Sequence, residues 1–132
     1  MTRERHAYWS AYIADLQGRM LLADWEVILD RKPPDNSDWA AGVVITHGRH
    51  LARISLYEDF DSCTRTEQRH DIVHELLHMH LWSLRSHLKQ QFGGLEGWVI
   101  IRDAHVSHEE FAVDQLARII APRMPLPPKV KP

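Results

Sequence analysis

The segment from 64 to 88 constrains the fold of this 132-residue chain more than any other. Thr64-Arg65-Thr66-Glu67 fits a capping box, S/T-x-x-E, which predicts the start of a helix. Beyond it, apolar residues recur every three or four positions, as on the buried face of an amphipathic helix. They are Ile72, Val73, Leu76, Leu77, Leu81, Leu84 and Leu88. The sequence therefore predicts one long helix packed along a core.

Residues 74 to 78 of this helix read His-Glu-Leu-Leu-His, an H-E-x-x-H motif. Residues four apart share one face of an α-helix, about 6 Å apart along the axis, so the imidazoles of His74 and His78 can reach one ion. Zinc prefers such ligands, and a catalytic zinc keeps one position open for water. Glu75 is placed to take a proton from that water. We therefore expect a zinc site that hydrolyses amide bonds; the alternative is a pair of core histidines satisfied by ordinary hydrogen bonds.

A third metal ligand has to come from outside the motif. The sequence favours Glu110, because Asp114 lies one turn later on the same helical face and can accept the second ring N–H of a ligand histidine. The alternatives are Glu109, His105 and His108. Residues 107 to 110 also fit a capping box, which would give Glu110 a purely structural role. The candidates for stabilising an oxyanion are His105, His108, Tyr57 and Arg102.

The other predicted elements make the chain an α+β protein. An apolar residue at every fourth position predicts an N-terminal helix over 5–23. Three β-prone runs predict a small three-stranded sheet, with strands over 25–30, 39–46 and 51–57. A hairpin turn is expected at 47–50, where Gly48 supplies a positive φ. A C-terminal helix is expected over about 107–121, while residues 98–101 fit either a strand or the start of a helix.

The strand over 51–57 is a candidate for the edge of the sheet beside the active-site cleft. An extended peptide could pair with it there as an added strand; the alternative is a strand paired on both sides. We expect a single domain over 1–121, in which all five tryptophans anchor the core. The tail over 122–132 holds five of the seven prolines and is expected to be extended and solvated.

Composition restricts the partners that we expect. The formal net charge of −2 argues against nucleic acid, and no run approaches the roughly 18 apolar residues that span a membrane. The charged N-terminus is not followed by the apolar stretch of a secretory signal. Cys63 is the single cysteine, so any metal must be held by histidines and carboxylates. A cytoplasmic protein that binds a protein or peptide substrate is expected.

Taken together, His74-Glu75-x-x-His78 and Glu110-x-x-x-Asp114 resemble the gluzincin clan of zinc metallopeptidases. The small size and the strands before the motif are similar to its minimal members, the ImmA/IrrE-like metallopeptidases and related phage-borne proteins. In that family a Glu-x-x-Ala-Asn-x-Phe-Ala helix supplies the third ligand. The matching positions here are Glu110, Val113, Asp114, Leu116 and Ala117, so valine, aspartate and leucine replace three family residues.

This resemblance implies a minimal zincin-like domain that holds Zn²⁺ and hydrolyses peptide bonds of a particular protein substrate. It also implies a phage-related origin. Two alternatives remain at this stage. One is a SprT-like zinc protein, whose third ligand would be a histidine, His105 or His108. The other is a zincin scaffold that binds a partner protein without turnover.

Overall fold

A computed structural model describes residues 1–32, 40–46 and 48–129 of the chain. The protein is α+β, with three long helices and a small mixed sheet of three strands. The helices are α1 (Arg3–Arg19), α2 (Arg65–Phe92) and α3 (Trp98–Ile120), and the strands are β1 (Glu26–Leu29), β2 (Ala41–Ile45) and β3 (Leu51–Leu56). Two short 3₁₀ helices, η1 (Glu58–Ser62) and η2 (Ala121–Arg123), flank α2 and α3 in sequence.

The strand order is β1-β3-β2, with β1 parallel and β2 antiparallel to β3. The strand over 51–57 is therefore central and paired on both sides, so its expected place at the edge was wrong. Within the described residues β2 pairs with β3 alone, which makes β2 the edge strand next to α2. The turn after β2 contains Gly48 at φ 75°, as predicted, whereas His47 in that turn and Trp39 before β2 lie outside the described residues.

The core lies between the sheet and the helices. Alternate residues of β3 point into it, because Ala52, Ile54 and Leu56 are fully buried while Arg53 is exposed. Ser55 breaks this alternation; it is buried too, and its hydroxyl donates to the carboxylate of Asp30 over 3.0 Å. The remaining buried apolar residues come mainly from α1, the first half of α2 and the second half of α3.

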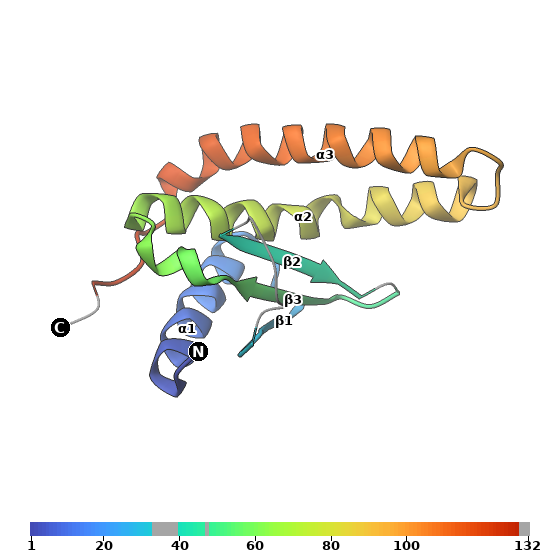
Figure 1. The fold of residues 1–132 in the computed structure, drawn as a ribbon. Helices are drawn as coiled ribbons and strands as arrows, with labels where there is room; N and C mark the ends of the chain where they lie inside the picture. Colours follow the sequence, from blue (N-terminus) through green and yellow to red (C-terminus); the bar gives the residue numbers. More distant parts are fainter. Residues whose placement is uncertain (33–39, 47, 130–132) are drawn as a thin grey trace.

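α2 and α3 form an antiparallel hairpin that extends beyond the strands, with α3 on the side of α2 away from the sheet (Figure 1). The structure makes residues 98–101 the first turn of α3, so this helix begins nine residues earlier than expected. Ser107 is therefore inside the helix, which excludes the alternative capping role for Glu110. The capping box at Thr64 is confirmed, since Thr64 and Glu67 bond each other's backbone N–H.

The C-terminal segment packs against the body of the protein, contrary to the expected solvated tail. Pro127 is fully buried, and backbone carbonyls of the segment accept hydrogen bonds from α1 and α2. The donors are Tyr12 (to Pro125, 2.7 Å), Arg65 (to Pro127, 2.8 Å) and Arg69 (to Met124, 3.0 Å). Packing thus continues past residue 121 to at least Pro128, whose carbonyl accepts from Tyr8; residues 130–132 lie outside the described part.

The tryptophans are only partly in the core. Trp9 and Trp25 are buried, as expected, whereas Trp82 and Trp98 are half-buried and line a cleft. None of the helices in the described part of the chain combines the length and the apolarity that a membrane crossing requires.

Candidate metal centre

The middle of α2 carries the H-E-x-x-H residues, and this helix packs against β2. Glu75 and His78 are buried, and His74 is half-buried. Leu76 and Leu77, the residues between them, point into the core. The motif is therefore held on a helix whose opposite face is fixed by packing, so the backbone that carries the two imidazoles has little freedom to move.

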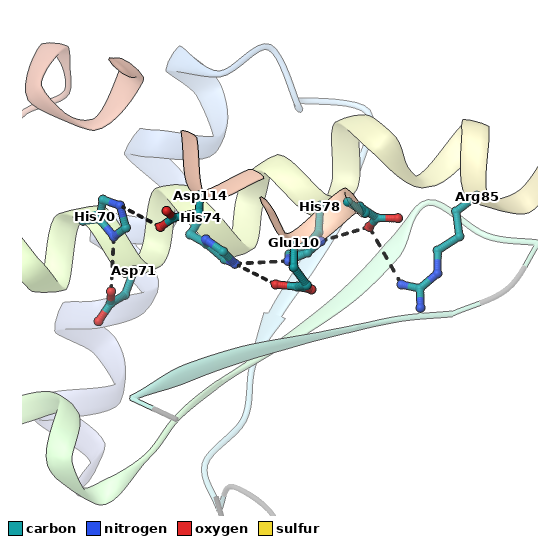
Figure 2. Close-up of polar contacts among 8 residues, drawn as sticks. His70, Asp71, His74, His78, Arg85, Glu110 and Asp114 are labelled. Atoms are coloured by element: carbon teal, nitrogen blue, oxygen red, sulfur yellow. Dashed lines mark hydrogen bonds and ion pairs between the residues drawn. The ribbon is translucent and has the colours of Figure 1, made fainter. Parts of the chain in front are cut away.

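Three side chains converge on one point: His74 and His78 from α2 and Glu110 from α3 (Figure 2). Nε2 of His74 lies 3.3 Å from Nε2 of His78. The carboxylate oxygens of Glu110 lie 3.4 Å from Nε2 of His74 and 3.3 Å from Nε2 of His78. Ligands bound about 2.1 Å from a tetrahedral zinc are separated from one another by about 3.4 Å. The two Nε2 atoms thus have this separation, and each lies at a similar distance from a different oxygen of Glu110. One ligand atom from each of the three residues can be chosen so that all lie within 4.8 Å of one another.

The other ring nitrogen of His78 is held by Glu109. Nδ1 of His78 lies 3.0 Å from Oε1 of Glu109, whose side chain is only 3% exposed. A carboxylate can only accept, so Nδ1 carries a proton, and in the neutral imidazole Nε2 then has its lone pair toward His74 and Glu110. Glu109, one of the alternative ligands, is therefore the residue that orients His78.

Glu109 also lies close to a second histidine and an arginine. Nε2 of His105 lies 3.1 Å from its Oε2, and the guanidinium of Arg85 lies 3.9 Å from its Oε1. Burial acts to raise the pKa of Glu109, but the hydrogen bond from His78 and the charge of Arg85 outweigh it and leave this pKa below its ordinary value. Glu109 is thus a buried anion. His105, another alternative ligand, lies against Glu109, while His108 is exposed to solvent.

Asp114 lies on the same side of α3 as Glu110 but one turn further along. Its carboxylate is 3.0 Å from Arg118 and 3.9 Å from Nε2 of His70, which in turn is 3.4 Å from Asp71 through Nδ1 (Figure 2). Asp114 therefore faces His70. The hydrogen bond that we expected Asp114 to accept from a histidine of the motif is accepted by Glu109, from His78.

The imidazoles of His74 and His78 differ in their electrostatic environment. Burial and the neighbouring His78 lower the pKa of His74 below its ordinary value, although Glu110 opposes this. For His78, burial acts in the same direction, but the hydrogen bond to Glu109 and the nearby carboxylates outweigh it and raise its pKa. Both effects come from groups within the cluster, so the protonation states of these side chains depend on one another.

Glu75 is buried beside the ligand cluster. Desolvation raises the pKa of its carboxyl group to about 7, and the negative charge of Glu110 adds to this effect. A backbone hydrogen bond from Val43 on β2 acts in the opposite direction and brings the carboxylate to the edge of the sheet. A carboxyl group with this pKa can both take up and release a proton near neutral pH, which is what a general base and acid requires.

The cluster opens into a cleft of about 620 Å³ between β2, α2 and α3. Its lining includes all of β2, Tyr57, the motif residues His74, Glu75 and His78, and Glu110. Further along the hairpin it includes Trp82, Arg85, Ser86, Lys89, Trp98, Arg102 and His105. Of the candidates for stabilising an oxyanion, Tyr57, Arg102 and His105 line the cleft, whereas His108 is not among its lining residues.

Two features of the site were not predicted from the sequence. One is the role of Glu109, and the other is the set of cleft residues beyond His78 on α2. A signal for the second existed, because Trp82, Arg85 and Lys89 follow His74 and His78 at spacings of three or four residues and so continue one helical face.

Comparison with known proteins adds no identification: no protein-family model, no curated protein and no solved structure matches this chain.

Proposed function

We propose that this chain is a zinc-dependent peptidase of the gluzincin type, in which His74, His78 and Glu110 hold the metal and Glu75 is the general base. The observation that carries the proposal is the convergence of two Nε2 atoms, 3.3 Å apart, on one carboxylate whose two oxygens lie 3.4 and 3.3 Å from them, beside a buried glutamate. Two neutral imidazoles and one carboxylate are a common ligand set of catalytic zinc, and they leave a fourth position for water or substrate.

Zinc bound there would acidify a water molecule and stabilise negative charge on the carbonyl oxygen of the substrate. The chain's own part in the reaction falls to Glu75, which takes the proton from the attacking water and returns it to the leaving amine. Tyr57 and His105 line the same cleft and are available to donate hydrogen bonds to the oxyanion, whereas Arg102 lies about two helical turns before Glu110, toward the turn of the hairpin.

An extended peptide is the substrate that best fits the shape of the site. β2 is the edge strand and its whole length lines the cleft, so a peptide can pair with it as an added strand. This pairing would lay the peptide across the metal centre with its side chains alternately toward α2 and away from it.

The test is metal content and peptide hydrolysis measured on the same preparations. Wild-type protein reconstituted with zinc should bind one equivalent of metal and cleave members of a synthetic peptide library. Glu75→Gln should retain the zinc and lose about 100-fold to 10,000-fold in rate. Glu110→Ala should lose both. Retained zinc with equal hydrolysis in wild type and Glu75→Gln would contradict the assignment of the base.

Failure of wild-type protein to bind a stoichiometric transition metal would exclude the proposal as a whole. A contaminating protease is controlled for by Glu58→Gln, which changes an exposed glutamate in η1 and should leave the activity unchanged.

A further inference from the structure

The cleft continues well beyond the metal centre, along the hairpin of α2 and α3. On α2 the lining residues after His78 are Trp82, Arg85, Ser86 and Lys89; on α3, before Glu110, they are His105, Arg102 and Trp98. Because the two helices are antiparallel, the later residues of one face the earlier residues of the other (Figure 1). One end of the cleft therefore holds the metal centre and the other lies toward the turn of the hairpin.

Charge is divided between these two ends. The acidic residues that line the cleft are Glu75 and Glu110, both at the metal centre. The far end is lined by three cations, Arg85, Lys89 and Arg102, which we call the cationic arm. Clefts lined by charge of one sign concentrate the electric field and attract ligands of the opposite sign.

The cations of the arm are only weakly paired with acidic groups of the described residues, so they can bind an anionic ligand. Arg102 pairs with Asp103, but both side chains are more than half exposed, so this contact is weak. Arg85 is 3.9 Å from Glu109, a distance that leaves most of its guanidinium donors for other partners. For Lys89, the described residues provide no ion-pair partner.

We propose that the cationic arm binds a carboxylate of the substrate peptide and so makes the enzyme selective for acidic sequences. This inference rests on the proposed function, since it concerns the peptide that would occupy the same cleft. Arginine and lysine side chains recognise carboxylates through charge-assisted hydrogen bonds. Trp82 and Trp98 lie along the same path and offer apolar surface to the intervening side chains.

The length of the cleft sets where the carboxylate should be. Arg85 is seven residues after His78 and Lys89 is eleven, which at a rise of about 1.5 Å per helical residue is roughly 10 to 16 Å. An extended peptide advances about 3.3 Å per residue. The preferred acidic residue should thus lie about three to five residues from the scissile bond.

Cleavage of a randomised library of synthetic decapeptides by zinc-loaded protein tests this selectivity. Wild type should enrich Asp and Glu three to five residues from the cleaved bond. The double variant Lys89→Glu/Arg102→Glu should lower kcat/KM for an acidic peptide by about tenfold, mainly through KM, relative to its glutamine counterpart. Arg19→Glu, which changes an exposed cation of α1 that pairs with Asp15, is the matched control and should change neither value.

Libraries with free and amidated C-termini distinguish the two sources of a carboxylate. Selectivity that survives amidation assigns the site to acidic side chains, and selectivity that requires the free terminus assigns it to the C-terminal carboxylate of the substrate. Two outcomes overturn the inference and leave the peptidase proposal standing. One is cleavage that prefers neither acidic side chains nor a free C-terminus, and the other is a preference that persists in Lys89→Glu/Arg102→Glu.

A binding measurement separates failure of the inference from failure of the proposed function. The same library is passed over immobilised Glu75→Gln protein, and the retained peptides are sequenced by mass spectrometry. If wild type does not cleave but acidic peptides are retained, and Lys89→Glu/Arg102→Glu abolishes their retention, the peptidase proposal fails and the cationic arm stands. Retention without an acidic preference overturns the arm as well.

Discussion

Glu109 and His78 form the most deeply buried polar contact of the proposed metal centre, with Oε1 of Glu109 lying 3.0 Å from Nδ1 of His78. The two residues come from different helices and are 31 positions apart in the chain. This contact fixes the tautomer of His78 and increases the electron density on Nε2, the atom that faces the proposed ion. Glu110, the next residue, faces the same point from the other side.

Replacing Glu109 with glutamine should weaken zinc binding by about tenfold to a hundredfold, because the amide keeps the shape but loses the charge that supports His78. Competition with a chromophoric chelator measures this affinity. Glu110→Gln is the matched variant at the neighbouring position and should weaken binding further, since it changes a ligand. If Glu109→Gln abolished binding while Glu110→Gln retained it, Glu109 would be the third ligand.

Zinc should stabilise the folded protein, because its ligands lie on two helices that are brought together only by folding. At a free zinc concentration 1,000 times the Kd, the gain in the free energy of unfolding is about 4 kcal/mol. Calorimetry with zinc and with EDTA should show a rise in Tm of about 10 °C or more. His78→Ala should lose this rise, and an equal rise in that variant would place the zinc elsewhere.

The stability of the metal-free protein should depend on pH through Glu75. The pKa of this carboxyl group is about 7 in the folded protein and 4.5 ordinarily, so the folded state binds its proton more tightly. Its contribution is fully present below pH 4.5 and is lost as pH rises through 7. Urea unfolding at pH 5 and pH 8 should show that wild type loses about 2 kcal/mol more than Glu75→Gln over this interval.

Comparison with Glu75→Gln controls for the histidines, because this variant retains the imidazoles that also titrate between pH 5 and pH 8. The same loss of stability in both proteins would mean that Glu75 ionises at its ordinary pKa.

Tyr12→Phe should lower the free energy of unfolding by about 1 kcal/mol, since it removes the donor to the carbonyl of Pro125. Chemical denaturation of the full chain measures this cost. The same substitution in a chain that ends at Arg123 is the matched comparison and should cost much less, because the acceptor is already absent. Equal costs in the two backgrounds would show that the hydroxyl of Tyr12 does not stabilise the C-terminal segment.

The residues of the H-E-x-x-H motif could be placed from the sequence because they lie on one helix. The period of an α-helix is fixed by its backbone, so His74 and His78 share a face wherever the helix packs. Choosing between Glu109 and Glu110 is a different problem. Neighbouring residues on a helix point about 100° apart, and the rotation of α3 against α2 decides which of them faces the imidazoles.

The order of the strands could not be predicted from the alternation of apolar and polar residues within each strand. The alternation of β3 correctly predicted that Ala52, Ile54 and Leu56 are buried, but the same alternation is compatible with an edge or a central position. Its place between β1 and β2 depends on the parallel pairing of residues 26–29 with 51–54, which is a contact distant in the sequence.

The C-terminal segment shows the limit of composition as a guide. Each proline of a proline-rich sequence lacks a backbone N–H donor but keeps a carbonyl that can accept a hydrogen bond. The partners of these carbonyls, Tyr12 on α1 and Arg65 and Arg69 on α2, are at least 55 residues away in the chain. Nothing in the composition of residues 122–129 indicates those donors.

The hairpin of α2 and α3 is longer than the sheet against which it packs. α2 has 28 residues, about 42 Å, whereas the longest strand has six, about 20 Å. The buried residues of α2 all lie between Gln68 and Met79, and those of α3 between Glu109 and Ala117. Backbone amides near the turn of the hairpin should therefore exchange with deuterium much faster than those around the metal centre. Ligand geometry would then be set by a rigid region, while the cationic arm belongs to one that opens readily by local unfolding.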